Sequence, residues 1–358
     1  MSQLKVYSKS DILAFTKVRK FETRLGEEVL TAADPANIAA SIERSPAEYV
    51  LLGIPEDIGV RANGAHSGHA GAIQGHGGGE MAWWAFLRDF LNIQSNDFLV
   101  GSSVLALGHF DFSDIGRLVE ANASSPEEKL DAYRHAVHTI DEAVEPLIRT
   151  ITAAGKIPIV IGGGHNNAYP LIKGSAKGLH KAGLTNLAQI NAVNLDAHPE
   201  FSPVEGRHSA NGFRYAEEDG FLEKYCVIGV QESYLPQNVW TDILNNPFVD
   251  CITYEDICVL EKRTFAQAVA HATGFTEDNY IGLELDLDAI AHMPGAGLPP
   301  SGLTPLHARQ YVTFAAIDSK IAYLHICEGA VCLGNGCSNP STGRLISYIV
   351  SDFLKARE

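Results

Sequence analysis

Short runs of apolar, often β-branched residues alternate with stretches of helical periodicity from residue 49 onward. Six such runs occupy residues 49–54, 156–162, 192–198, 224–230, 280–288 and 322–328. A run that is apolar at successive positions is typical of a strand buried on both faces. The alternation of such strands with helices predicts an α/β fold with a mostly parallel central sheet covered by helices.

The clearest helix signal is the sequence Ser125-Pro126-Glu127-Glu128, in which Ser125 can cap the helix and Pro126 can occupy its first position. This signal predicts a helix that reaches about Ala153. Further helices are expected near residues 260–272, 306–318 and 342–356.

Two segments differ from this pattern. Residues 1–45 are polar with helical stretches, and we expect an N-terminal extension that packs outside a single domain of residues 46–358. Residues 59–79 are rich in glycine and carry His66, His69 and His76. These histidines could bind a metal, but we interpret the segment as a loop over the mouth of a site, because its glycines permit unusual backbone angles.

Charge and composition exclude several classes of function. The net charge of −16 would repel nucleic acid and anionic membranes, and any anionic substrate would need a local cation. The first ten residues lack the apolar run of a signal peptide, and no stretch approaches 18 consecutive apolar residues, so we expect a cytoplasmic protein with no membrane span. The six cysteines match no zinc pattern and are interpreted as reduced, mostly buried thiols.

Polar side chains gather where three of the predicted strands end. One strand runs into Gly162-Gly163-Gly164-His165, the next reaches Asp196, His198 and Glu200, and a third ends at Asp286 and Asp288. Ligands of open α/β sheets bind at the carboxyl ends of the strands. Residues spaced by two on an extended chain point the same way, so these side chains are expected to converge.

Four carboxylates in one cleft would repel each other unless cations were present. Two divalent ions would balance the four negative charges, and oxygen-rich ligation with two imidazoles suits manganese better than zinc. A bridged metal pair can convert water to hydroxide near neutral pH. The sequence therefore predicts a dinuclear metal site, with two Mn²⁺ ions as its cofactors.

These motifs resemble the ureohydrolase family, which includes arginase, agmatinase and formimidoylglutamase. The resemblance covers roughly residues 48–350 and implies a three-layer α/β/α, arginase-like fold. It implies that one metal is bound by His165, Asp196, Glu200 and Asp286, and the other by Asp196, His198, Asp286 and Asp288. It further implies that Glu328 faces the substrate, and that Ser209 and Asn211 belong to a substrate-binding loop.

Three positions depart from the family pattern. Glu200 stands where the family normally has Asp, Ala291-His292 replaces an Asp-Pro pair, and Phe213 replaces the proton-shuttle histidine of arginase. The last change argues against arginase itself. The first two leave open a non-catalytic, metal-poor homologue that acts as a binding subunit.

The local sequences of residues 48–64, 205–216 and 322–330 are most similar to those of formimidoylglutamase-like members of the family. Their reaction converts N-formimidoyl-L-glutamate and water to L-glutamate and formamide. We expect Glu200 to orient a hydroxide for attack on a substrate held by Glu328. His208 or His292 could shuttle the proton, and either could equally be a loop histidine.

The two carboxylates of this substrate require a cation, for which Arg207 and Arg214 are the candidates near the loop; both could instead form surface salt bridges. The alternative activity is that of an agmatinase-type or arginase-type guanidino hydrolase that releases urea. The resemblance also implies a homo-oligomer, a trimer or a hexamer, that acts on a small molecule.

Overall fold

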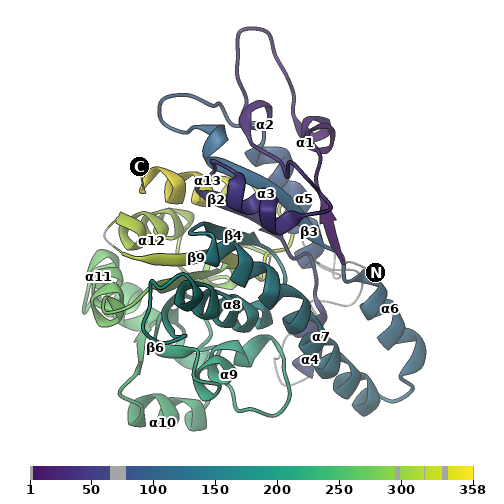
Figure 1. The fold of residues 1–358 in the computed structure, drawn as a ribbon. Coiled ribbons are helices and arrows are strands. Elements are labelled where there is room, and N and C mark those ends of the chain that lie inside the picture. The colour runs from purple at the N-terminus through teal and green to yellow at the C-terminus, as the bar shows by residue number, and fades with distance from the viewer. Residues whose placement is uncertain (1–2, 65–77, 295–298, 318, 333–337, 358) are drawn as a thin grey trace.

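A nine-stranded sheet forms the centre of the computed structural model, which describes all residues except 1–2, 65–77, 295–298, 318, 333–337 and 358, and only the backbone of 78–81 (Figure 1). The strand order is β1-β3-β2-β4-β9-β8-β5-β6-β7. The strands are β1 (Leu4–Val6), β2 (Tyr49–Gly53), β3 (Val104–Phe110), β4 (Ile157–Ile161), β5 (Ile190–Leu195), β6 (Leu222–Val230), β7 (Val249–Thr253), β8 (Ile281–Asp286) and β9 (Ile321–Cys327). All neighbouring strands pair in parallel except β1 and β3, which are antiparallel.

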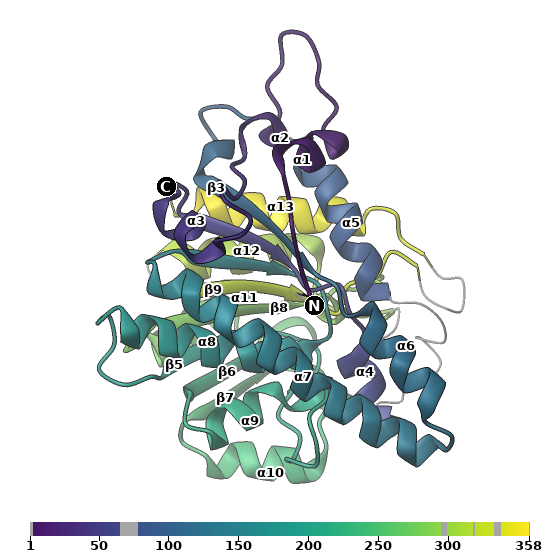
Figure 2. The same cartoon turned by 45° about the vertical axis from the view of Figure 1, so that its right-hand side comes forward.

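Helices cover both faces of the sheet (Figures 1 and 2). They are α1 (Lys9–Phe15), α2 (Leu25–Glu28), α3 (Ile38–Arg44), α4 (Ile58–Ala62), α5 (Gly78–Phe90), α6 (Ser113–Asn122), α7 (Pro126–Ala153), α8 (Ala168–Lys181), α9 (Gly212–Glu218), α10 (Gln237–Asn245), α11 (Phe265–Thr276), α12 (Pro305–Ile317) and α13 (Thr342–Lys355). One apolar core joins the sheet to α5, α11, α12 and α13, and a second core joins it to α7, α8, α9 and α10. The predicted three-layer α/β/α fold is therefore confirmed.

The six strands expected from the sequence are present, because each is apolar at successive positions and buried on both faces. The predicted long helix is α7. Ser125 Oγ accepts a hydrogen bond from Glu128 N at 3.1 Å, and Glu128 Oε2 accepts one from Ser125 N at 3.2 Å. This reciprocal cap fixes the first turn of α7.

The N-terminal segment is more than an outer extension. Strand β1 adds an antiparallel edge to the sheet, and the buried side chains of Ile12 and Leu25 join the core beneath α5. Tyr7 OH accepts a hydrogen bond from Trp83 Nε1 at 3.0 Å. These contacts tie residues 3–45 to the main sheet, and the boundary at residue 46 stays a prediction.

The glycine-rich segment is helical at both described ends. Helix α4 occupies its beginning and α5 starts at Gly78, which corrects the expectation of one continuous loop from 59 to 79. His66, His69 and His76 lie outside the described residues, so neither interpretation of them is tested.

In the part of the chain that the structure describes, no helix is long and apolar enough to cross a membrane. Five cysteines there carry free thiols, namely Cys226, Cys251, Cys258, Cys327 and Cys332. Cys337 lies outside the described residues.

Candidate metal centre

A tight turn after β4 places His165 over the edge of the sheet. Gly162 and Gly163 adopt φ values of +90° and +82°, which are accessible mainly to glycine. A Cβ on Gly163 would lie 2.4 Å from Asn167 Nδ2 and 2.6 Å from the Ile54 carbonyl oxygen. The glycines are therefore needed both for the turn and because Asn167 and the Ile54 carbonyl approach Gly163 closely.

Glu56, which sequence reasoning missed, holds this turn in place. Its buried carboxylate accepts hydrogen bonds from Gly164 N at 3.1 Å, Asn167 Nδ2 at 2.6 Å and Ile58 N at 2.6 Å. The same carboxylate thus joins the start of α4 to the turn that carries His165. Nothing in its sequence context distinguishes it from a solvated residue.

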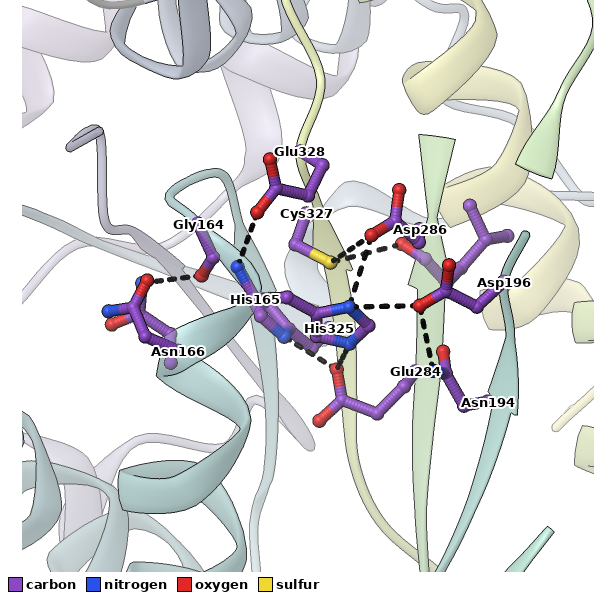
Figure 3. A network of polar contacts seen from close by, with 12 residues as sticks. Gly164, His165, Asn166, Asn194, Asp196, Glu284, Asp286, His325, Cys327 and Glu328 are labelled. Carbon is purple, nitrogen blue, oxygen red and sulfur yellow. Dashed lines mark hydrogen bonds and ion pairs between the residues drawn. The ribbon is translucent and has the colours of Figure 1, made fainter. Parts of the chain in front are cut away.

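His165 brings two strand ends together (Figure 3). Its Nδ1 lies 3.1 Å from Asp196 Oδ2, after β5, and 3.1 Å from Asp286 Oδ2, at the end of β8. Ligands of one octahedral ion at roughly 2.1 Å are separated by about 3 Å, so the three atoms are spaced as ligands of one divalent ion would be. The predicted convergence of these three residues is confirmed.

A second group comprises Asp196, His198 and Glu200, whose ligand atoms lie within 4.8 Å of one another. Strand β5 ends before these residues, so strand alternation does not align them. Asp196 Oδ1 instead accepts a hydrogen bond from His198 N at 2.8 Å. Asp286 and Asp288 form the same turn, with Asp288 N donating to Asp286 Oδ1 at 2.7 Å. These Asx turns place each pair of side chains at the site.

Buried negative charge dominates the site. Burial, and then the charge of Asp196, raises the pKa of Glu200 to about 8. Burial and the charge of Asp286 raise the pKa of Glu328 well above its usual value. Burial, the largest effect, would lower the pKa of His198, but the hydrogen bond to Asp196 and the charges of Asp196, Glu200 and Asp288 together outweigh burial and raise the pKa to about 10. The cluster therefore retains protons that a bound cation would displace, as expected for a metal site.

Two further observations fit a metal. The buried Glu200 Oε2 has no hydrogen-bond partner among the described residues, and the φ of Glu200 is +48°, a strained value for this residue. Glu328 has a φ of +56°, and its Oε1 accepts a hydrogen bond from His165 N at 2.8 Å. Strain of this kind is maintained where the surrounding structure fixes a side chain for function.

A cavity of about 840 Å³ opens onto this cluster. Its walls include His198, Glu200, Asp286, Asp288 and Glu328 from the strand ends, and His208 and Ser209 from the loop before α9. Tyr234 also lines it and stacks on the His198 ring, with centroids 5.0 Å apart. The cavity has the size of a small-molecule site.

Three predicted substrate-binding residues do not line this cavity. Asn211 is buried, where its Oδ1 accepts a hydrogen bond from Arg207 Nη1 at 3.1 Å and its Nδ2 donates to the Gly206 carbonyl at 2.8 Å. Arg207 is engaged within the protein, by Asp141 and by the carbonyl of Asn166 at 2.8 Å. Asn211 and Arg207 therefore stabilise the conformation of the loop before α9 through contacts within the protein.

Arg214 lies on α9, where it pairs with Glu218 at 3.0 Å and covers the ring of Phe201. Neither predicted cation is thus brought to the cavity. His292, the alternative shuttle, has a φ of +62° and is not among the described lining residues.

A mostly parallel sheet between two helical layers, with imidazoles and carboxylates at the ends of its central strands, defines an arginase-like α/β protein. The chain belongs to the Arginase family, whose family model matches residues 47–344. The predicted family is confirmed.

Relatives with sequence similarity include formimidoylglutamases. That of Aromatoleum aromaticum is 28% identical over 289 residues, which cover 79% of this chain and 76% of the relative. Those of several Streptococcus pyogenes strains are 23% identical over 206 residues, 56% of this chain, and the match spans only 61% of their length.

Solved structures share the fold. Formimidoylglutamase from Bacillus subtilis has a TM-score of 0.68 at 14% identity, covering 95% of this chain and 93% of that one. Trypanosoma cruzi formiminoglutamase with Mn²⁺ has a TM-score of 0.65 at 19% identity, covering 94% and 98%.

Proposed function

We propose that this chain is a hydrolase that uses two divalent metal ions, manganese, to cleave a C–N bond of an amidine substrate. The best candidate reaction converts N-formimidoyl-L-glutamate and water to L-glutamate and formamide. The observation that carries the proposal is the approach of His165 Nδ1 to Asp196 and Asp286, 3.1 Å from each, beside a cavity lined by four more acidic side chains.

The donor set is the one that manganese prefers, carboxylate oxygens with two imidazoles. His165, Asp196, Glu200 and Asp286 would hold one ion, and Asp196, His198, Asp286 and Asp288 the other. When bound, the ions supply Lewis acidity and lower the pKa of water. Relatives with the name formimidoylglutamase, and a solved structure of one with Mn²⁺, support this assignment.

Glu328 holds the substrate in this proposal. Its hydrogen bond from His165 N fixes the carboxylate at the cavity wall, where it can form paired hydrogen bonds to the N–H groups of an amidinium. Ser209, in the loop before α9, also lines the cavity and offers a hydroxyl to the rest of the substrate.

His208 lines the cavity, where its ring is placed to donate a hydrogen bond to the leaving nitrogen. Its Nδ1 accepts a hydrogen bond from Ala210 N at 3.2 Å, so the neutral ring carries its proton on Nε2. Water adds to the amidine carbon, and Glu200 orients the attacking oxygen and carries one proton of that water to the glutamate nitrogen. The bond from the amidine carbon to this nitrogen then breaks, which releases formamide and glutamate.

A second candidate is a guanidino substrate with a neutral or cationic tail. None of the described residues that line the cavity is Lys or Arg, while Glu205 adds a further carboxylate. The undescribed segments 65–77, 295–298 and 333–337 also contain no Lys or Arg in their sequence. A substrate with two carboxylates would therefore rely on the metals and on histidines for positive charge.

One assay separates these candidates. Manganese-loaded protein is incubated with formimidoylglutamate, arginine and agmatine, and formamide and urea are measured. Formamide from the first substrate supports the proposal, and urea from either of the others supports the guanidino alternative. Protein that binds no manganese and forms neither product would instead be the non-catalytic homologue.

We further propose that the enzyme works in the cytoplasm as a homo-oligomer. The family resemblance supports assembly, and α12 and α13 carry exposed apolar side chains at Leu306, Ile317 and Tyr348. Light scattering of the purified protein at micromolar concentration should give a multiple of 38.6 kDa, and a monomer would contradict the assembly.

A further inference from the structure

A buried carboxylate lies beneath the metal ligands and is not explained by the proposed reaction. Glu284 is on β8, two residues before Asp286, and its side chain is completely buried (Figure 3). Its Oε2 lies 2.6 Å from His325 Nδ1, and its Oε1 accepts a hydrogen bond from Tyr323 OH at 2.7 Å. A carboxylate this deep is retained only where its partners fix it.

The pairing of β8 with β9 places Glu284 beside its two hydrogen-bond partners. Parallel pairing sets Glu284 opposite His325 and Gly282 opposite Tyr323. A Cβ on Gly282 would lie 2.5 Å from the Tyr323 ring, so the glycine gives the ring room to reach Glu284. The backbone carbonyl of Glu284 also accepts a hydrogen bond from Tyr311 OH at 2.9 Å. Tyr323 and His325 therefore fix the carboxylate, and Tyr311 fixes the backbone that carries it.

The same carboxylate faces the rear of His165. Glu284 Oε2 lies 3.5 Å from His165 Nε2, while His165 Nδ1 faces Asp196 and Asp286 on the other side of the ring. A histidine that binds a metal through Nδ1 must be neutral, and its one N–H is then on Nε2. His165 Nε2 has no hydrogen-bond partner among the described residues, and Glu284 Oε2 is the carboxylate oxygen that lies beside it.

We propose that Glu284 is a positioning residue for the metal centre, which rests on the proposed dinuclear function. It accepts the Nε2–H of His165 and so fixes both the tautomer and the ring orientation that direct the Nδ1 lone pair toward Asp196 and Asp286. His325 and Tyr323 in turn hold Glu284. Carboxylates that orient a metal-binding histidine in this way commonly raise metal affinity by 10- to 100-fold, on the order of the effect expected here.

The test compares Glu284→Gln with a matched control, Tyr323→Phe, in the full-length protein. Tyr323→Phe removes one hydrogen bond to Glu284 without touching His165. Manganese binding is measured by calorimetry and by metal content after dialysis. Glu284→Gln should weaken one of the two metal equivalents by roughly 10- to 100-fold. In Tyr323→Phe, His325 still holds the Glu284 carboxylate, so the control should stay within about threefold of wild type at both metal equivalents.

A spectroscopic readout distinguishes positioning from a general loss of structure. Electron paramagnetic resonance of wild-type protein with two manganese ions should show a spin-coupled pair, whereas Glu284→Gln at the same loading should show an isolated ion. Unaltered affinity and a coupled spectrum in Glu284→Gln would overturn the proposal.

Two other outcomes, a variant that does not fold and a wild-type protein that binds no manganese, have separate interpretations. If Glu284→Gln does not fold, Glu284→Asp, which withdraws the carboxylate by one methylene, is expected to show the same selective loss, and wild-type binding by that variant would overturn the proposal. Wild-type protein that binds no manganese would instead refute the dinuclear function itself, and the role of Glu284 with it.

Discussion

Arg207 and Asp141 form a two-point ion pair, with N–O distances of 2.9 and 3.1 Å, and both side chains are buried. The guanidinium also packs against the rings of Tyr169 and Tyr215, 4.7 and 5.1 Å from their centroids. Because Asp141 is on α7, the pair fastens the loop that carries His208 and Ser209 to this helix. Arg207, which was expected to bind the substrate, therefore stabilises the position of this loop instead.

Arg207→Ala should lower the free energy of unfolding by about 3–5 kcal/mol, because it leaves the Asp141 carboxylate buried without its partner. Urea denaturation of the metal-loaded protein measures this loss. The matched control is Arg214→Ala, whose partly exposed pair with Glu218 should contribute about 1 kcal/mol or less. Equal losses in the two variants would mean that the buried pair has no special role.

Arg214→Ala also tests the earlier expectation that this residue binds substrate. Since its side chain covers Phe201 and pairs with Glu218, the Michaelis constant for formimidoylglutamate should stay within about twofold of wild type. Steady-state kinetics at saturating manganese decide the matter. A tenfold rise in the Michaelis constant would show that Arg214 does contribute to substrate binding.

Glu56→Ala should weaken metal binding although Glu56 is not itself a candidate metal ligand. The substitution leaves Gly164 N, Asn167 Nδ2 and Ile58 N without their shared acceptor, and each unsatisfied buried donor costs about 1–3 kcal/mol. Both the unfolding free energy and the manganese affinity should fall, as measured by denaturation and calorimetry. The neighbouring Asp57→Ala, which loses a partly exposed pair with Arg61, is the control. Unchanged manganese affinity in Glu56→Ala would separate this carboxylate from the site.

The sequence was sufficient to predict the sheet and the convergence of most candidate ligands because both follow from local rules. Successive apolar residues marked the six central strands, and the carboxyl ends of parallel strands meet at one edge. These rules place His165, Asp196 and Asp286 together from the sequence alone. The strands that were missed are short or interrupted by polar residues, as in β1 and β7, or contain a glycine and a histidine, as in β3.

What the sequence could not predict depends on where long side chains point. Arg207 and Arg214 flank the loop in sequence, but their guanidinium groups turn to Asp141 and Glu218. Glu56 and Glu284 carry no local signal either, since a carboxylate near a strand is recognisable as buried only when its tertiary donors are known.

Removal of metal should destabilise the folded chain. Each bound ion stabilises the native state by about 2.7 kcal/mol at a hundredfold excess over its dissociation constant, and without it the buried carboxylates repel one another. Chelation should therefore lower the melting temperature by several degrees, and added manganese should restore it. Differential scanning calorimetry provides the measurement. A melting temperature that chelator and manganese both leave unchanged would contradict metal binding in this fold.

Glu200→Asp tests whether the longer carboxylate is fitted to this site. Glu200 has a φ of +48°, which Asp tolerates better than Glu, so the substitution should not reduce the unfolding free energy of the metal-free protein. The backbone, however, holds the carboxylate for a side chain that is longer by one methylene.

We therefore expect Glu200→Asp to bind one manganese equivalent at least about tenfold more weakly, and kcat to fall by a similar factor or more, since a ligand displaced by about 1 Å loses its interactions. Calorimetry and product assays measure the two effects. Glu200→Gln, which keeps the length but removes the charge, is the matched variant and should lose both the metal equivalent and activity. If Glu200→Asp instead equals or exceeds wild type in both, the glutamate is a neutral replacement for the family's aspartate, and its strained backbone has no part in the chemistry.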